Sequence, residues 1–72
     1  MNSLNYRIKK DLSNHKVFRA GSYIFQYEDL SLTVYNETLR NGVFMKNRMF
    51  VQGVNSIIDS AEFIESFLGK VA

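Results

Sequence analysis

His15 is the only histidine in the chain, so acid-base, nucleophilic or metal chemistry built on an imidazole would have to start there. Asp11 and Ser13 lie close by in the sequence and complete the residue types of a serine triad. Residues this close together near the end of a helix rarely reach the nucleophile, base and orienter geometry. The carboxylates Glu28 and Asp29 are adjacent at an expected turn and lack the spacing of metal ligands. We therefore expect no triad and no metal site.

Glu62 and Glu65 are three residues apart in a helical segment, which makes them neighbours on the helix surface. That spacing is the minimum for a carboxylate acid and base, but helix capping and surface solvation account for both residues without any reaction. The four glycines never cluster into a phosphate-binding loop, and the absence of cysteine excludes disulfides and thiolate sites. We expect a protein that is not an enzyme, with no cofactor and no small-molecule substrate.

Basic residues collect near the N-terminus. Residues 1–19 hold five basic residues and one acidic residue, while residues 51–72 carry a net charge of −2. Tyr6 and Phe18 interleave with the first group, as stacking platforms for bases would. Nucleic-acid binding is therefore one hypothesis, and its candidate residues are Arg7, Lys9, Lys10, Lys16 and Arg19, with Lys46 and Arg48 in support. The modest total charge of +2 and the possibility of a solvated helix face count against it.

Aromatic residues support a second hypothesis, protein recognition. They form 14% of the chain, and interface cores favour tyrosine and phenylalanine with arginine nearby. An exposed edge strand offers a further route, because its free backbone groups can pair with another chain. The candidate interface residues alternate away from the best core face or lie where the strand register is open: Phe18, Ile24, Tyr35, Phe44 and Phe50. They could equally complete an ordinary monomer core.

The elements that would position these residues follow from hydrophobic periodicity. Leu4, Ile8 and Leu12 form one helical stripe, so we expect a helix over residues 4–13 with Ser3 as N-cap and Asn14 as the stop. From Lys16 the period changes to two, which predicts a hairpin that turns at Glu28 and Asp29, or through a longer loop because this pair is a poor type I′ turn. Its expected core face carries Tyr23, Phe25, Tyr27, Leu30, Leu32 and Val34, with Tyr27 opposite Leu30, Phe25 opposite Leu32 and Tyr23 opposite Val34.

Two later signals complete the expected architecture. Asn41 and Gly42 form a strong turn signal before a strand over residues 43–54, although a reversal at Asn47 would instead split that strand in two. In the final helix we expect Asp59 as N-cap, Glu62 as its capping-box partner and Ile58 stapled onto Phe63. The stripe Phe63, Ile64, Phe67, Leu68 and Val71 should pack on the sheet as a core lid.

These patterns predict one small α+β domain over residues 1–72: a short N-terminal helix, an antiparallel meander of three or four strands, and a C-terminal amphipathic helix on one sheet face. No apolar run is long enough to span a bilayer and no secretory signal is visible, so we expect a cytoplasmic protein. The composition, free of cysteine and proline, is similar to that of small accessory proteins of phages and other mobile elements. We expect a regulator or inhibitor that binds a protein partner, as a homodimer because 72 residues make a marginal core, with nucleic-acid binding as the alternative.

Overall fold

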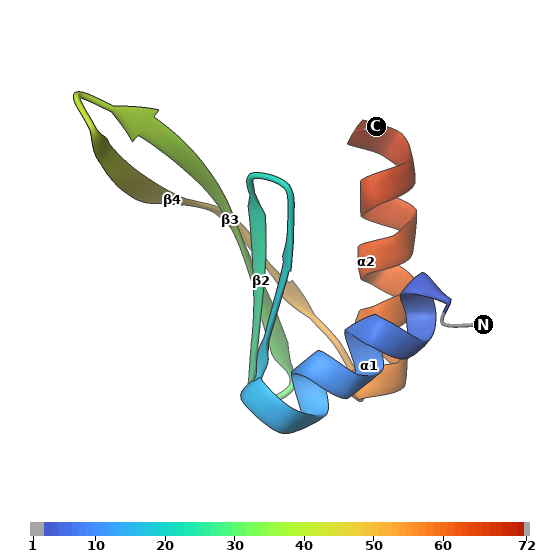
Figure 1. The fold of residues 1–72 in the computed structure, drawn as a ribbon. Helices are drawn as coiled ribbons and strands as arrows, with labels where there is room; N and C mark the ends of the chain where they lie inside the picture. The colour runs from blue at the N-terminus through green and yellow to red at the C-terminus, as the bar shows by residue number, and fades with distance from the viewer. Residues whose placement is uncertain (1–2, 72) are drawn as a thin grey trace.

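The computed structural model describes residues 3–71 and has an α+β architecture (Figure 1). Four antiparallel strands form one open sheet in the order β1-β2-β3-β4, and a helix stands at each end of the chain. No helix within the described residues is both long enough and apolar enough to cross a membrane. The elements are α1 (Leu4–His15), β1 (Val17–Ala20), β2 (Tyr23–Glu28), β3 (Ser31–Arg40), β4 (Val43–Gly53) and α2 (Ile57–Val71). This order of elements confirms the predicted fold class.

Helix α1 begins where the sequence predicted and ends later. Ser3 is the N-cap, and its hydroxyl accepts a hydrogen bond of 3.1 Å from the Tyr6 amide. The helix continues past Asn14 to His15, and Lys16 ends it in the left-handed conformation with φ 61°. The Lys16 amide donates to the Leu12 carbonyl, which satisfies one of the free carbonyls of the last turn.

The hairpin of β2 and β3 turns one residue later than expected. Asp29 and Leu30 both have positive φ, 48° and 57°, as a two-residue type I′ turn requires. Both the expected and the observed turn contain Asp29, whose short side chain can bond locally and tolerates this conformation, so the displacement replaces Glu28 by Leu30 in the turn. Leu30 is consequently exposed in the turn and does not join the core face.

Each predicted cross-strand pair is therefore shifted by two residues. Tyr27 lies opposite Leu32 and Phe25 opposite Val34, while Tyr23 lies opposite Asn36. A shift of two preserves which face each side chain occupies, because side chains alternate with a period of two. The predicted core face is therefore correct apart from Leu30, although the predicted pairing is wrong.

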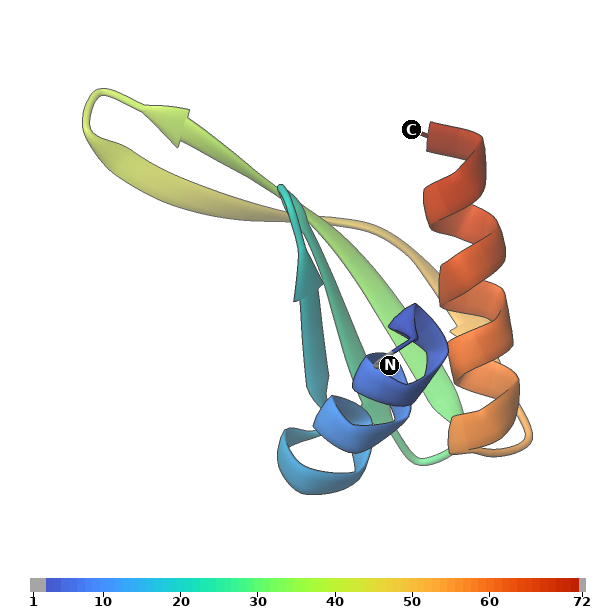
Figure 2. The same ribbon diagram turned by 45° about the vertical axis from the view of Figure 1, so that its right-hand side comes forward.

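Strand β4 is one continuous strand, as expected, and no reversal occurs at Asn47. Asn41 and Gly42 make the preceding turn with φ 53° and 78°. Val34 pairs with Phe50 whereas Tyr35 pairs with Arg48, so Met49 is an extra residue in a β-bulge. The bulge separates a basal part of the hairpin, near the helices, from a distal part that projects past them (Figure 2).

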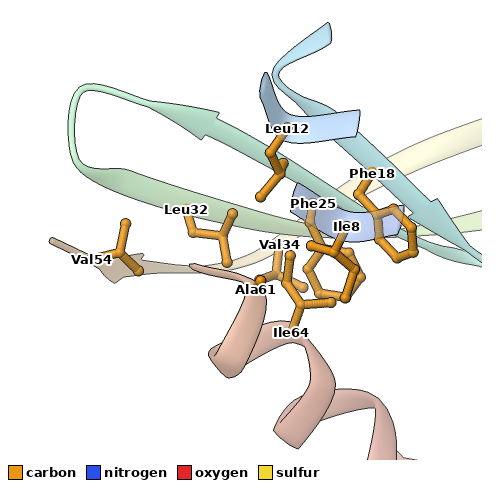
Figure 3. Packing of buried hydrophobic residues seen from close by; sticks show 9 residues of the cluster. All are labelled: Ile8, Leu12, Phe18, Phe25, Leu32, Val34, Val54, Ala61 and Ile64. Atoms are coloured by element: carbon orange, nitrogen blue, oxygen red, sulfur yellow. The ribbon is translucent and has the colours of Figure 1, made fainter. Parts of the chain in front are cut away.

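Both helices cover the same face of the sheet, and the core lies between them and the strands (Figures 2 and 3). Ile8 of α1 lies next to Ile64 of α2 in Figure 3, and Leu12 of α1 belongs to the same buried cluster. The buried apolar cluster consists of Ile8, Leu12, Phe18, Phe25, Leu32, Val34, Val54, Ala61 and Ile64. All of the buried sheet residues in this cluster come from β1, from β2 and from the basal part of β3.

The start of α2 corrects the predicted cap. The helix begins at Ile57, and the Ser56 hydroxyl accepts a bond of 3.1 Å from the Asp59 amide, so Ser56 is the capping side chain. Asp59 occupies the third helical position, and its carboxylate accepts a bond of 3.0 Å from the Asn55 amide. Ile58 is 61% exposed and makes no staple, and Glu62 is exposed. A serine therefore caps the helix in place of the expected aspartate, three residues earlier than expected.

Phe67 fixes α2 to the sheet, which confirms the prediction that this helix is a core lid. Its ring lies 5.2 Å from that of Tyr23, 5.7 Å from that of Phe25 and 5.9 Å from that of Phe50, centroid to centroid. The first two pairs have edge-to-face geometry, which aromatic rings prefer. Only the end of the predicted stripe, Val71, is largely exposed.

Phe67→Ala should lower the free energy of unfolding by about 3 kcal/mol, because it leaves a cavity among four aromatic neighbours. Urea denaturation followed by circular dichroism measures this change. Ile58→Ala on the exposed side of the same helix is the matched control and should change stability by less than about 0.5 kcal/mol. Equal effects of the two substitutions would contradict the lid assignment.

Candidate functional site

The residues considered for catalysis do not converge. Asp11 and His15 are one helical turn apart, whereas Ser13 lies midway between them in sequence and so on the other side of α1. None of the hydrogen bonds among residues 3–71 joins these three side chains. The same part of the chain contains no group of three or more histidine and acidic residues placed to hold a metal ion.

The exposed apolar residues concentrate instead on the distal hairpin, which we call the β-arm and define as residues 35–48. Figures 1 and 2 show the β-arm extending away from both helices. Val43 is 60% exposed and Phe44 67% exposed, and the other exposed apolar side chains of the arm and its bulge are Leu39, Met45 and Met49. Soluble monomers rarely leave contiguous apolar surface beyond a few hundred Å² without a binding role.

Both faces of the β-arm are apolar near its tip. Leu39 pairs with Phe44, and these two side chains lie on the sheet face turned away from the helices, which we call the open face. Val43 and Met45 alternate onto the other face, beyond the reach of the core. A strand with one buried and one solvent-exposed face alternates apolar and polar residues. The tip lacks this alternation, because apolar side chains lie on both of its faces.

The open face carries a charged and aromatic cluster next to these apolar residues. The Lys46 ammonium lies 4.4 Å from the centre of the Tyr35 ring, a cation–π contact. Arg48 pairs with Tyr35 across the strands, and a guanidinium nitrogen of Arg19 lies 3.3 Å from a carboxylate oxygen of Glu37. Two cations, Lys46 and Arg48, therefore stand two residues apart on one face of β4.

The outer edge of β4 has no neighbouring strand, since β4 ends the sheet order. The Glu37 amide donates to the Ser22 carbonyl at 2.7 Å, so the backbone groups of Glu37 point towards β2 and away from β4. Its partner Lys46 therefore belongs to a pair without hydrogen bonds, and the Lys46 backbone groups point outward. The same alternation turns Phe44 and Arg48 outward, whereas Met45 and Asn47 bond inward to β3.

One hollow of about 620 Å³ lies at the opposite end of the sheet from the arm tip. The Lys16 ammonium is 5.7 Å from the centre of the Tyr27 ring at this hollow. Its lining residues are Lys16, Gln26, Tyr27, Glu28, Asp29 and Leu30, all of them exposed or half-buried. It is an open surface depression, and the sequence analysis did not identify it.

The predicted interface residues separate into three environments. Phe18 and Ile24 are 1% and 3% exposed, so the expectation that they offer surface to a partner is wrong. Phe50 packs on Phe63 with ring centres 6.1 Å apart, and Tyr35 is half-buried. Of the five candidates, only Phe44 is mostly exposed.

The predicted nucleic-acid residues also separate. Arg7, Lys9 and Lys10 lie on α1, which packs on the helix-covered face of the sheet, whereas Arg19 belongs to the open face. Lys46 and Arg48 share the open face of β4, and Lys16 lies at the C-terminal end of α1 near the hollow. The seven cations therefore do not form one continuous footprint.

Sequence reasoning missed most of the apolar arm residues, Leu39, Val43, Met45 and Met49. A usable signal was present, because the run Val43, Phe44 and Met45 is apolar at consecutive positions after a tight turn. Such a run places apolar side chains on both faces of an edge strand. A core on one side of the sheet can cover only one of these faces.

Comparison with known proteins adds nothing to this geometry: no protein-family model, no curated protein and no solved structure matches the chain.

Hydrogen exchange followed by NMR tests the assigned edge. The Lys46 and Arg48 amides face outward and should exchange at least tenfold faster than those of Met45 and Asn47, which donate to β3. Comparable protection of all four amides would show that the β4 edge is already covered in the free protein.

Proposed function

We propose that the chain is a non-enzymatic protein-recognition module that binds a partner protein through the β-arm. The observation that carries this proposal is the exposure of apolar side chains on both faces of the arm, with Phe44 at 67% and Val43 at 60%. Burying apolar surface stabilises a protein by about 25 cal/mol per Å², and the apolar surface of the arm stays exposed in the chain by itself. A partner that covers the arm would gain this stabilisation.

The overall shape supports the same proposal. The radius of gyration is 12.2 Å, whereas a compact domain of this length has about 11 Å. The longest axis, 37 Å, exceeds the shortest, 24 Å, because the arm projects from the body (Figure 1). An extended hairpin adds surface without adding core, so stability alone gives no reason for it.

The sequence predicts a homodimer as well as a protein partner, and β4 has a feature that bears on pairing with a second copy of the chain. The strand reads almost alike in both directions about Asn47, with Lys46 mirrored by Arg48 and Met45 by Met49. Antiparallel pairing of two β4 edges about Asn47 would therefore set Lys46 of each copy opposite Arg48 of the other. Like charges directly opposite each other destabilise a sheet, so we propose a different chain as the partner.

Affinity capture from a native lysate of the source cells tests the use of the arm. The double variant Val43→Ser with Phe44→Ser removes one apolar side chain from each face and should lose specific partners by at least tenfold in recovered amount. Ile58→Ser, an equally exposed apolar residue on α2, is the control and should retain them.

Identical partners recovered by the wild-type protein, the arm variant and the control would contradict the proposal. Circular dichroism of each variant verifies that the fold is kept, because none of the three residues belongs to the core cluster.

Direct nucleic-acid binding is the second candidate, favoured by one observation. Arg19, Lys46 and Arg48 project from three positions on the open face, and Tyr35 among them offers an aromatic ring. Sheet faces that bind single strands combine cations with such rings. The carboxylate of Glu37 within this group weakens the field that a phosphate backbone would meet.

Fluorescence anisotropy with short single-stranded and duplex oligonucleotides at several salt concentrations tests this candidate. If the open face binds phosphates, the logarithm of the affinity should fall linearly with the logarithm of salt concentration, and Lys46→Glu with Arg48→Glu should reduce affinity at least tenfold. Lys9→Glu with Lys10→Glu on α1 is the control of equal charge. Equal losses from both pairs, or no binding at low salt, would remove the open face as a nucleic-acid site.

A further inference from the structure

Building on the proposed function, we infer that the partner contributes an extended segment that adds to the outer edge of β4 as an antiparallel fifth strand. The segment carries two acidic residues in alternate positions, followed towards its C-terminus by apolar residues. The backbone edge, the paired cations and the apolar tip of the arm each specify one part of this segment.

The backbone edge specifies an extended conformation. Phe44, Lys46 and Arg48 present their amide and carbonyl groups outward, at alternate positions along one regularly paired stretch of strand. A strand that adds to a sheet edge satisfies such groups by main-chain hydrogen bonds. The bulge at Met49 ends this regularly paired stretch, so the docking length is about six residues, from Val43 to Arg48.

The two cations specify acidic residues. Side chains directly opposite each other on neighbouring strands lie on the same face, so partner residues opposite Lys46 and Arg48 point to the open face. Alternate residues of the added strand have the same spacing as Lys46 and Arg48, about 7 Å. Glu37, the carboxylate that faces Lys46 from β3, already lies within 3.3 Å of Arg19. Two carboxylates on the added strand would pair with both cations.

The tip specifies apolar residues. An antiparallel segment passes Arg48 first and then runs towards Phe44 and Val43, so its acidic residues precede its apolar ones. Opposite Phe44 the partner side chain lies on the open face beside Phe44, and opposite Met45 it lies on the other face. Apolar residues at both positions would cover the two faces that the chain leaves exposed.

A second copy of the chain fits this edge less well, because Lys46 and Arg48 repel their own mirror images. A nucleic acid would use the two cations but would leave the outward amides and the apolar tip without partners. The segment of another protein satisfies all three features at once.

Fluorescence anisotropy of labelled ten-residue peptides with the full chain tests the inference. The probe is an extended peptide in which two glutamates alternate with threonine and precede three valines. One control replaces both glutamates with lysine, and a second carries N-methyl groups on the alternate residues that face β4. The unmodified acidic peptide should bind at least tenfold more tightly than either control.

Charge reversal on the protein provides the matched variants. Lys46→Glu with Arg48→Glu should reverse the preference, so that the lysine peptide binds more tightly than the acidic one. Lys9→Glu with Lys10→Glu changes the net charge equally on α1 and should leave the preference unchanged.

Equal binding of the N-methylated and unmodified peptides would overturn strand addition, and equal binding of the acidic and lysine peptides would overturn the charge rule. Because the chain has no cysteine, an Asn47→Cys variant that forms a disulfide dimer at micromolar concentration would assign the edge to a second copy and also overturn the inference. If the peptide tests fail but the Val43→Ser, Phe44→Ser variant still loses its partners in the capture experiment, only the inference of strand addition is refuted. Loss of arm dependence in the capture experiment would refute the proposed function itself.

Discussion

The packing of two short helices on a longer sheet determines the rest of the structure. α1 and α2 both cover the same face, and the buried sheet residues end at Val34, just before the bulge. Phe67 and Phe50 hold α2 against the basal part of the sheet. The hairpin continues for several residues beyond the point where any helix can cover it, so its apolar side chains stay exposed. The β-arm is exposed because the β3–β4 hairpin is longer than the stretch of sheet that the helices cover. The covered part of the sheet stabilises the fold, and the uncovered part is available for recognition.

The charges on β4 give this exposed half its selectivity. Natural proteins place lysine on sheet edges to prevent pairing between identical edges, and Lys46 and Arg48 occupy such positions on β4 between the arm tip and the bulge. The same two cations would favour a strand that brings carboxylates. Lys46 is also held above the Tyr35 ring, and this contact orders its long side chain before any partner arrives. One pair of residues thus opposes self-association and prefers an acidic partner.

The sequence predicted the fold because its strongest signals were local. The Ser3 cap, the turn at Asn41 and Gly42, and the α2 stripe around Phe67 were correct, since each depends on residues close together in the chain. The first hairpin turn was displaced because Asp29 can occupy either central position of the turn, and the α2 cap was displaced because Ser56 can cap a helix as well as Asp59. The candidate site was only partly predictable. Burial of Phe18 and exposure of Phe44 depend on how far the helices reach along the sheet, and no local pattern encodes that reach.

Amide hydrogen exchange of the protein with and without the acidic peptide tests the central claim, recognition by the β4 edge, most directly. The Lys46 and Arg48 amides, which face outward in the free chain, should become protected at least tenfold when the peptide binds, because they then donate to its backbone. Amides of α1 and α2 should be unchanged. Binding that leaves the Lys46 and Arg48 amides in fast exchange, or that protects the helices instead, would contradict the account.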